Sequence, residues 1–304
     1  MTISTIRADK YPSRCSARPA IRARRDPVVY GLGGRDDALA QDQVSQYERD
    51  GFLHFERFLA PAAVEALQAG MDQLWHDADP SDPGVIAEPD SRTIRSIFDV
   101  HRRSRPFDQL ARDPRILAIV QQILGGRVYV HQSRINYKRG FDGREFYWHS
   151  DFETWHVEDG MPRMRAVSLS IALSDNSMLN GPLMLIPGSH RHYVACVGAT
   201  PEEHFKTSLR RQEYGVPDPE SLAWLVDDAG GIAAPAAPAG SMILFDCNLM
   251  HGSNSNITPF ARSNLFIVYN SIDNRLERPF GGRSPRPRFV AAREAEPLVA
   301  HGAG

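Results

Sequence analysis

Cysteine is scarce in this chain, with three residues among 304, namely Cys15, Cys196 and Cys247. Such an odd and widely spaced set does not make a disulfide framework, and no CxxC pair is present to suggest a zinc ribbon or a thioredoxin-like site. Apolar runs long enough to cross a membrane are missing as well. The stretch 1–14 has no continuous apolar core, so a secretory signal is not expected. We therefore expect a cytoplasmic protein without a membrane partner.

An excess of positive charge is lacking too. The chain has 35 Lys and Arg against 37 Asp and Glu, which gives a formal net charge of -2. A nucleic-acid-binding face normally makes a domain basic, so no nucleic-acid partner is expected. The short cluster Arg22, Arg24 and Arg25 is interpreted as part of a solvated, mobile N-terminus. With 42% hydrophobic and 24% charged residues, the composition is otherwise that of an ordinary globular protein.

The first part of the chain has the signals of loops and helices. Residues 1–40 are rich in Arg, Pro, Gly and Asp and are expected to be irregular. Residues 41–304 are expected to form a single domain, with helices within 41–125. A Pro at a first helical turn, an Asp cap and a Gly-Gly stop are typical helix boundaries. They predict helices that begin near Gln41, at Pro61 and at Pro114.

Beyond Gly126 the apolar pattern changes from helical spacing to period two, which is typical of strands. The strand candidates are 127–138, 167–173, 182–186, 241–246 and 262–270. Helices followed by strands predict an α+β protein with a mainly antiparallel β core, here over 127–290. The mixed and partly Pro-rich stretch 198–238 is interpreted as an insertion that covers this core, helical in part around 201–214.

The segment Phe146-Tyr-Trp-His-Ser-Asp151 holds the most informative polar pair. In a strand or extended loop, residues two apart point to the same side, so His149 and Asp151 can face one ion. His251, which follows the predicted strand 241–246, is the best candidate for a third ligand. Two histidines and one carboxylate on one face of an octahedron form the facial triad of non-haem Fe(II) oxygenases.

A histidine and an aspartate two positions apart also occur together by chance, and the chain has 11 histidines. Taken alone, His149 would be interpreted as a hydrogen-bonded loop histidine. The combination favours a metal site, because the pair ends a period-two region, a second histidine follows a later strand, and an arginine-bearing strand comes next. His190 lies in a Pro-Gly-Ser-His turn and is expected to have a structural role.

An oxygenase of this type needs a two-electron donor, and 2-oxoglutarate is the expected cosubstrate together with O2. Its far carboxylate requires a buried cation, ideally one with bidentate geometry. Arg262 begins the strand after His251, and Asn264 and Phe266 share its face. A surface ion pair is the alternative. Cosubstrate binding is favoured because the same face then becomes apolar.

The first strand of the β region supplies a second polar set. Its alternation places Val128 and Val130 on the face that also carries Gln132, Asn136 and Lys138. If the valines point to the core, these polar side chains point inward as well, where they are costly unless a ligand satisfies them. The alternative is a strand whose polar end simply faces solvent.

Three segments together resemble the phytanoyl-CoA dioxygenase superfamily. Tyr47-Glu-Arg-Asp-Gly-Phe52 is similar to a motif near the start of its members, and Gly181-Pro-Leu-Met-Leu-Ile-Pro-Gly-Ser-His190 to its strand and turn after the first ligands. The segment Phe146-Tyr-Trp-His-Ser-Asp-Phe-Glu-Thr-Trp-His-Val-Glu-Asp-Gly-Met-Pro162 is very similar to the diagnostic segment of ectoine hydroxylases. The resemblance covers about residues 11–288, and this long segment is its specific part.

The resemblance implies a double-stranded β-helix (jelly roll, cupin-like) core with flanking helices, and a homodimer. It implies the hydroxylation of L-ectoine to 5-hydroxyectoine with Fe(II), 2-oxoglutarate and O2. By position, it assigns the iron to His149, Asp151 and His251. It assigns 2-oxoglutarate contacts to Lys138, Arg262, Asn136, Phe146 and Ser253. It assigns ectoine contacts to Gln132, Trp155, Phe245, Phe266, Thr154, Ser170 and Asn264.

Three other interpretations stay open at this point. A hydroxylase of the same superfamily could act on another small zwitterion or amino-acid derivative. A jelly-roll protein could bind metal without catalysis, although Arg262 and Lys138 would then have no purpose. A zinc hydrolase would need a general base, for which Glu153 is the obvious candidate. Iron dependence together with consumption of 2-oxoglutarate distinguishes these alternatives.

Overall fold

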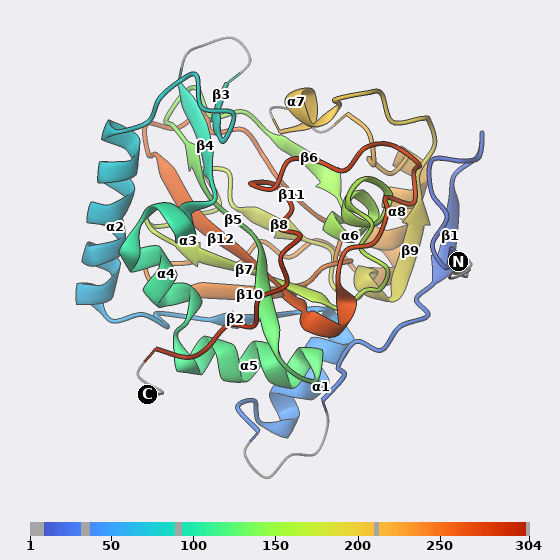
Figure 1. Ribbon diagram of the computed structural model, residues 1–304, viewed down its shortest axis with the longest axis horizontal. Coiled ribbons are helices and arrows are strands. Elements are labelled where there is room, and N and C mark those ends of the chain that lie inside the picture. The colour runs from blue at the N-terminus through green and yellow to red at the C-terminus, as the bar shows by residue number, and fades with distance from the viewer. Residues whose placement is uncertain (1–8, 32–36, 89–92, 210–212, 302–304) are drawn as a thin grey trace, which may run out of the picture.

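The computed structural model describes residues 9–31, 37–88, 93–209 and 213–301. In these ranges the strands form a seven-stranded sheet, a three-stranded sheet and a two-stranded pair, with antiparallel pairing throughout (Figure 1). Flanking helices complete the predicted double-stranded β-helix, so the fold prediction is confirmed.

The large sheet has the strand order β2-β10-β7-β12-β5-β4-β3. Its strands are β2 (Phe52–Phe55), β10 (Met242–Asp246), β7 (Ala166–Ala172), β12 (Arg262–Ser271), β5 (Val128–Lys138), β4 (Ile94–Phe98) and β3 (Val85–Ala87). The small sheet consists of β6 (Phe146–His149), β11 (His251–Ser253) and β8 (Leu183–Leu185). A third pairing joins β1 (Ala20–Ala23) to β9 (His192–Ala195).

The predicted helices are present, and several shorter ones were not expected. The helices are α1 (Gln41–Asp50), α2 (Pro61–His76), α3 (Val100–Arg103), α4 (Arg105–Ala111), α5 (Pro114–Leu124), α6 (Asp151–Thr154), α7 (Phe205–Ser208) and α8 (Pro219–Ala229). A π-helix, η1 (Trp155–Asp159), continues α6, and η2 (Ser189–Arg191) and η3 (Ile272–Asn274) are 3-10 turns. No helix among the described residues is long and apolar enough to cross a membrane.

Helix α5 shows how local sequence sets these boundaries. The Asp113 carboxylate accepts a hydrogen bond from the Arg115 backbone N–H at 2.9 Å, which caps the first turn. Gly125 ends the helix with φ of 65°, a left-handed conformation that favours glycine. Both boundaries agree with the sequence prediction. Between them, Ile116 and Val120 are fully buried.

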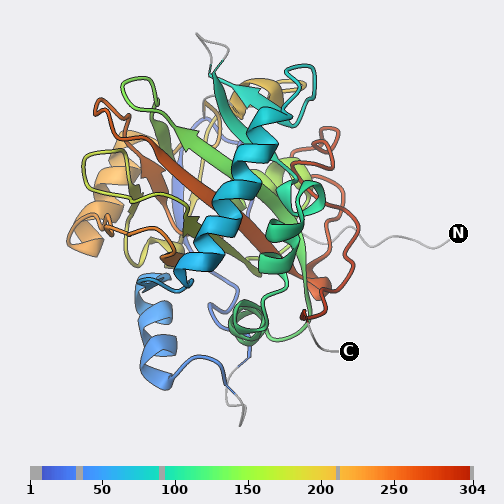
Figure 2. The ribbon, with the colours of Figure 1, turned by 90° about the vertical axis from the view of Figure 1, so that its left-hand side faces the viewer.

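The main core lies between the outer face of the large sheet and helices α2 to α5. Figure 2 shows α2 in front of this sheet, with the shorter helices beside it. Val120 of α5 belongs to the same apolar cluster as Leu169 of β7, Leu244 of β10 and Ile267 of β12. Complete burial of such a side chain stabilises the fold by roughly 1.5–3 kcal/mol. The helices thus hold one face of the sheet fixed while its other face forms the site.

Strand β5 contains a β-bulge at His131. Val268 of β12 lies opposite Gln132, but the next residue, Tyr269, lies opposite Val130. His131 is therefore an extra residue in β5, and the alternation of side chains reverses there.

The bulge corrects the prediction made for this strand. Val128 and Val130 pack in the main core, and beyond the bulge it is Ile135 that does so. Gln132 and Lys138 consequently lie on the opposite face from the valines. The prediction that they share a face was wrong, although the polar set does reach the interior between the two sheets.

The N-terminal segment differs from the solvated, mobile tail that its composition suggested. Tyr11 is 1% exposed, and its hydroxyl donates a hydrogen bond to Asp26 at 3.0 Å. Arg22 and Arg25 are exposed as expected. The Arg24 guanidinium instead forms an ion pair with Asp246 of β10 at 2.8 Å. The segment is mostly irregular but packed, with β1 as its regular element.

The described residues of the region 198–238 contain two helices. The short α7 falls within the part expected to be helical, while the longer α8 lies beyond it. Leu225 of α8 packs with Ile186, Val194 and Met250 beside the small sheet. The predicted helical part also includes 210–212, which lie outside the described residues.

Candidate metal centre and adjoining cavity

Three predicted ligands meet at the mouth between the two sheets. His149 ends β6, His251 begins β11, and the two residues are paired across the small sheet. Asp151 is the first residue of α6. Its Oδ1 lies 3.6 Å from His149 Nε2 and 3.9 Å from His251 Nε2, and one ligand atom from each residue lies within 4.8 Å of the others. Side chains with this geometry can hold one metal ion.

Hydrogen bonds fix which ring nitrogen of each histidine faces the ion. Nδ1 of His149 lies 2.8 Å from the Tyr147 carbonyl oxygen, and Nδ1 of His251 lies 3.0 Å from the Leu249 carbonyl oxygen. A carbonyl only accepts, so each Nδ1 carries the proton and each Nε2 presents its lone pair. This pattern is usual for metal-binding histidines, and the three residues fit an Fe(II) ion.

Burial sets the charge of the centre. Desolvation lowers the pKa of His251 to about 4, so the ring is neutral and able to act as a ligand at pH 7. Desolvation raises the pKa of Asp151, but its interactions with His251 and His149 and the nearby Arg134 guanidinium together hold that pKa below the ordinary value. Its second oxygen accepts a hydrogen bond from Ser168 Oγ at 3.1 Å. The donor set is thus two neutral imidazoles and one carboxylate.

Two buried cations lie next to this centre. Lys138 and Arg262 are 7% and 4% exposed, and the register pairs them directly across β5 and β12. Lys138 Nζ donates to Ser253 Oγ at 2.8 Å and to the Asn254 carbonyl oxygen. Arg262 donates to the Gly181 carbonyl oxygen, while its buried Nε has no hydrogen-bond partner.

Neither cation has an acidic partner within ion-pair distance among the described residues. Desolvation lowers the pKa of Lys138 to about 6, and the positive charge of Arg262 contributes to that shift. Desolvation likewise lowers the pKa of Arg262 to about 10, with a further contribution from Arg95. Arg95 itself pairs with Glu88 at 2.9 Å. Buried positive charge without a counter-ion fits an anionic ligand.

The other residues of the predicted cosubstrate set lie around these cations. Asn136 accepts a hydrogen bond from Ser96 Oγ of β4 at 2.8 Å. Asn264, opposite Asn136 in the register, donates to Ser170 Oγ at 3.0 Å, and its own Oδ1 is buried without a partner. The ring of Phe146 lies 5.0 Å from the ring of His149.

A cavity next to His149 and Asp151 is lined by some of the other predicted residues and by residues that were not predicted. Besides these two ligands, the predicted ones are Gln132, Phe146, Thr154 and Trp155, and the added ones are Arg134, Ser208, Leu209 and Arg286. The ring of Phe245 lies 5.0 Å from the ring of His251, and Phe266 packs in the same apolar cluster as Phe245. The cavity therefore has aromatic walls, one amide and two guanidinium groups.

Comparison with known proteins agrees with this geometry. Residues 47–264 match the family "Phytanoyl-CoA dioxygenase (PhyH)". The ectoine dioxygenase of Bordetella parapertussis is 56% identical over 288 residues, which cover 94% of this chain and 93% of that protein. The ectoine dioxygenase of Stutzerimonas stutzeri is 52% identical over 95% of this chain and 96% of that protein.

The chain belongs to the ectoine dioxygenases of the phytanoyl-CoA dioxygenase family.

Solved structures give the same result as the family comparison. EctD from S. alaskensis with 2-oxoglutarate and 5-hydroxyectoine is 49% identical, with a TM-score of 0.87 over 96% of this chain and 98% of that chain. EctD with bound Fe has a TM-score of 0.85 at 48% identity, over the same shares of both chains. These comparisons confirm the resemblance to ectoine hydroxylases of the phytanoyl-CoA dioxygenase superfamily that the sequence predicted.

Two arginines of the cavity were not assigned to the site from the sequence. The Arg134 guanidinium donates to Gln132 Oε1 and lies 5.1 Å from the centre of the Phe266 ring. Arg286 binds both Asp159 oxygens, at 2.8 and 2.6 Å. Arginine is common on protein surfaces, so composition did not distinguish these two. The position of Arg134 two residues after Gln132, on the same face, was the available signal.

Glu153 is not a free general base. Arg14 binds it through two nitrogens, at 3.0 and 2.7 Å, and also binds Glu158 at 2.6 Å. Ser13 Oγ donates to the same carboxylate at 2.6 Å. A buried carboxylate whose two oxygens are taken up by these donors is not available to a substrate, which removes the candidate base of the zinc hydrolase interpretation.

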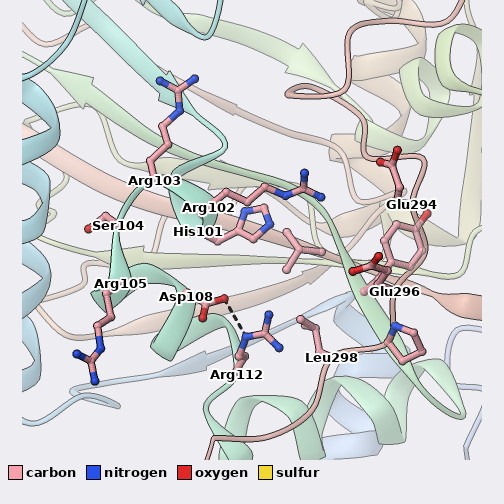
Figure 3. A pocket seen from close by; sticks show the side chains of 13 residues that line it. His101, Arg102, Arg103, Ser104, Arg105, Asp108, Arg112, Glu294, Glu296 and Leu298 are labelled. Carbon is pink, nitrogen blue, oxygen red and sulfur yellow. Dashed lines mark hydrogen bonds and ion pairs between the residues drawn. The ribbon is translucent and has the colours of Figure 1, made fainter.

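A large cavity elsewhere in the protein is separate from the candidate metal centre. It encloses about 710 Å³ between the α3–α4 arginines and the C-terminal segment with Glu294 and Glu296 (Figure 3). Several of its charges are paired, as Asp108 with Arg112 at 2.8 Å and Arg103 with Asp82 at 2.6 Å. It contains none of the three metal-centre residues.

Proposed function

We propose that this protein hydroxylates L-ectoine to 5-hydroxyectoine, consuming 2-oxoglutarate and O2 and releasing succinate and CO2. The observation that carries the proposal is the meeting of a fixed His-Asp-His triad with two buried basic side chains that have no acidic partner among the described residues. The ectoine dioxygenase relatives, and the S. alaskensis structure with 2-oxoglutarate and 5-hydroxyectoine, support the substrate.

His149, Asp151 and His251 would hold Fe(II) through both Nε2 atoms and one carboxylate oxygen. Iron bound there would activate O2 and couple the decarboxylation of 2-oxoglutarate to oxidation of a substrate C–H bond. The Tyr147 and Leu249 carbonyl groups keep the rings in the required tautomer. The chain itself supplies geometry and exclusion of water, and no acid or base side chain is needed for the C–H step.

Arg262 and Lys138 would bind the far carboxylate of 2-oxoglutarate, with Asn136, Phe146 and Ser253 around the rest of the molecule. A planar guanidinium suits a carboxylate because it offers two parallel N–H donors. The unpartnered Arg262 Nε is one such donor. The negative charge of this dianion would favour the protonated form of Lys138 beside Arg262.

Ectoine carries an amidinium ring and a carboxylate. The Trp155 indole face would attract the delocalised cation, worth roughly 0.5–2 kcal/mol. Gln132 and Thr154 would hydrogen-bond its polar edges, and Ser170 and Asn264 would lie deeper between the sheets. Phe245 and Phe266 would supply apolar walls. We add Arg134 and Arg286 as candidate partners for the carboxylate, because both line the cavity beside Trp155.

A related hydroxylase acting on another small zwitterion is the main alternative. The test mixes the protein with Fe(II), 2-oxoglutarate and ectoine without oxygen, then admits air and measures succinate and product mass. We expect succinate and a product heavier by one oxygen atom. A non-catalytic metal-binding protein would give neither. Turnover of a related zwitterion but not of ectoine would retain the chemistry and replace the substrate.

The homodimer and the cytoplasmic location belong to this proposal as well. The three cysteines are free thiols, with Cys15 exposed and Cys196 and Cys247 buried, which is compatible with a reducing compartment. Light scattering on the purified protein would measure its mass in solution. A mass of one chain would contradict the dimer.

A further inference from the structure

A second cavity adjoins the one beside the metal centre. It encloses about 460 Å³ and is lined by residues from η1, from α7 with the segment before it, and from the segment 283–287. Glu202 and Arg283 stand on opposite walls and form an exposed ion pair at 3.5 Å. We call this second cavity the antechamber.

The antechamber and the metal-centre cavity share their walls. On the α6–η1 helix, Trp155 lines the inner cavity, and Glu158, one turn later, lines the antechamber. In the α7 region, Leu209 lines the inner cavity, and Phe205, one turn earlier, lines the antechamber. Arg286 lines both. Because the α6–η1 helix, the α7 region and the segment with Arg286 each line both spaces, the two cavities lie end to end.

The charged side chains that line the antechamber are each paired. Glu158 pairs with Arg14 and Arg286 pairs with Asp159, both at 2.6 Å, and these two partners do not themselves line the space. Glu203 pairs with Lys206 at 2.7 Å, and Glu202 faces Arg283 across the space. Such walls present no net field that would hold a free anion or a free cation, but they solvate a molecule with one charge of each sign. A small zwitterion can therefore pass without being trapped.

We propose that the antechamber is the access route of the zwitterionic substrate to the metal centre, and the exit route of the product. The inference rests on the proposed function, which supplies the substrate class. Lys138 and Arg262, the proposed partners of the cosubstrate carboxylate, line neither this space nor the inner cavity.

The test obstructs the route without altering the inner cavity. Ser284→Trp places an indole on an exposed position of one wall, and Glu202→Trp places one on the opposite wall. Thr207→Trp is the matched control, because Thr207 is exposed on α7 and lines neither cavity. Ectoine binding to the anaerobic protein with Fe(II) and 2-oxoglutarate is followed by stopped-flow tryptophan fluorescence.

An obstructed route slows both the binding and the release of ectoine. We expect Ser284→Trp and Glu202→Trp to lower kon and koff each by roughly tenfold, while Kd changes by less than about twofold. The control should keep both rates. If both variants bind and release ectoine at the control's rates, the proposed access route is wrong, while the proposed function is unaffected. If the unaltered protein does not bind ectoine, the proposed function itself fails and this inference fails with it.

Discussion

Lys138 and Arg262 face each other directly in the register of β5 and β12, so the fold places two buried basic side chains side by side, with no acidic partner within ion-pair distance among the described residues. Burying charge in this way costs stability that only an anionic ligand returns. The pair therefore makes separate predictions for ligand affinity and for stability.

Removal of Arg262 should affect 2-oxoglutarate far more than ectoine. Loss of one partner of a buried charged contact costs about 2–5 kcal/mol, which corresponds to an increase of roughly 30- to several-thousand-fold in the apparent KM for 2-oxoglutarate. Arg262→Ala tests this by steady-state kinetics with each substrate varied in turn. Arg115→Ala, at an exposed position of α5, is the control. An equal rise in both KM values would contradict the assigned role.

Lys138 should make the ligand-free protein less stable as the pH falls. Its pKa is lowered from 10.5 to about 6, so between these values the unfolded chain binds more protons than the folded one. The stability contribution is complete above pH 10.5 and is lost as the pH falls towards 6. Lys138→Met should therefore stabilise the protein at pH 7, by about 1–3 kcal/mol, and weaken 2-oxoglutarate binding.

Urea unfolding at several pH values measures this effect. The stability difference between Lys138→Met and the unaltered protein should shrink as the pH rises from 7 to 10. A constant difference over that range would show that Lys138 does not titrate as the structure implies.

Loss of Arg14 should strongly lower the stability of the fold, although the sequence suggested a mobile tail around this residue. Its guanidinium pairs with Glu153 and Glu158 on either side of Trp155. Arg14→Met would leave the buried Glu153 without an ion-pair partner among the described residues and Glu158 with only the longer contact to Arg286 at 3.8 Å, at a cost of about 3–5 kcal/mol. Arg49→Ala removes an exposed pair with Asp50 and should leave the urea midpoint nearly unchanged. Similar urea midpoints for both variants would contradict the prediction.

Trp155 should matter for ectoine and not for 2-oxoglutarate. Trp155→Ala removes an aromatic contact worth roughly 0.5–2 kcal/mol, or a two- to thirtyfold rise in the KM for ectoine. Some decarboxylation of 2-oxoglutarate should continue without hydroxylation, seen as more succinate than product. Trp224→Ala, in the partly exposed α8, is the control. Unchanged KM and coupling would place Trp155 outside the substrate site.

Asp151 should be required for iron and for turnover. Asp151→Ala leaves two imidazoles without a carboxylate, so we expect iron content and succinate formation to fall below detection. Asp77→Ala, at an exposed helix end, should retain both. Iron bound at one equivalent with wild-type turnover in Asp151→Ala would refute the triad.

The parts of the fold that follow from local chemistry could be predicted from sequence. The Asp113 cap and the Gly125 stop set α5 within the chain itself, and period two identified β5, β7, β10 and β12. The triad was predictable because His149 and Asp151 are two positions apart and His251 follows a strong strand. In each case the signal lies within a few neighbouring residues.

Features that depend on distant contacts could not be predicted in this way. In the sequence, the bulge at His131 shows only as a change in the alternation of apolar residues, from the even positions 128 and 130 to the odd position 135. The π-helix η1 and the hairpin of β3 and β4 have no strong periodicity, and tertiary packing sets them. Arg14 and Arg286 are buried because carboxylates from other segments meet them, which composition does not reveal.

The α6–η1 helix is held from both ends of the sequence, by Arg14 near the beginning and by Arg286 near the end. During synthesis, the metal ligands leave the ribosome long before Arg286 does. At a synthesis rate of about 5–20 residues per second, several seconds pass between the synthesis of the metal ligands and the synthesis of Arg286. During this time the α6–η1 helix can pair with Arg14 but not yet with Arg286. Iron capture by the growing polypeptide is therefore expected to follow, and not to precede, the release of its last segments.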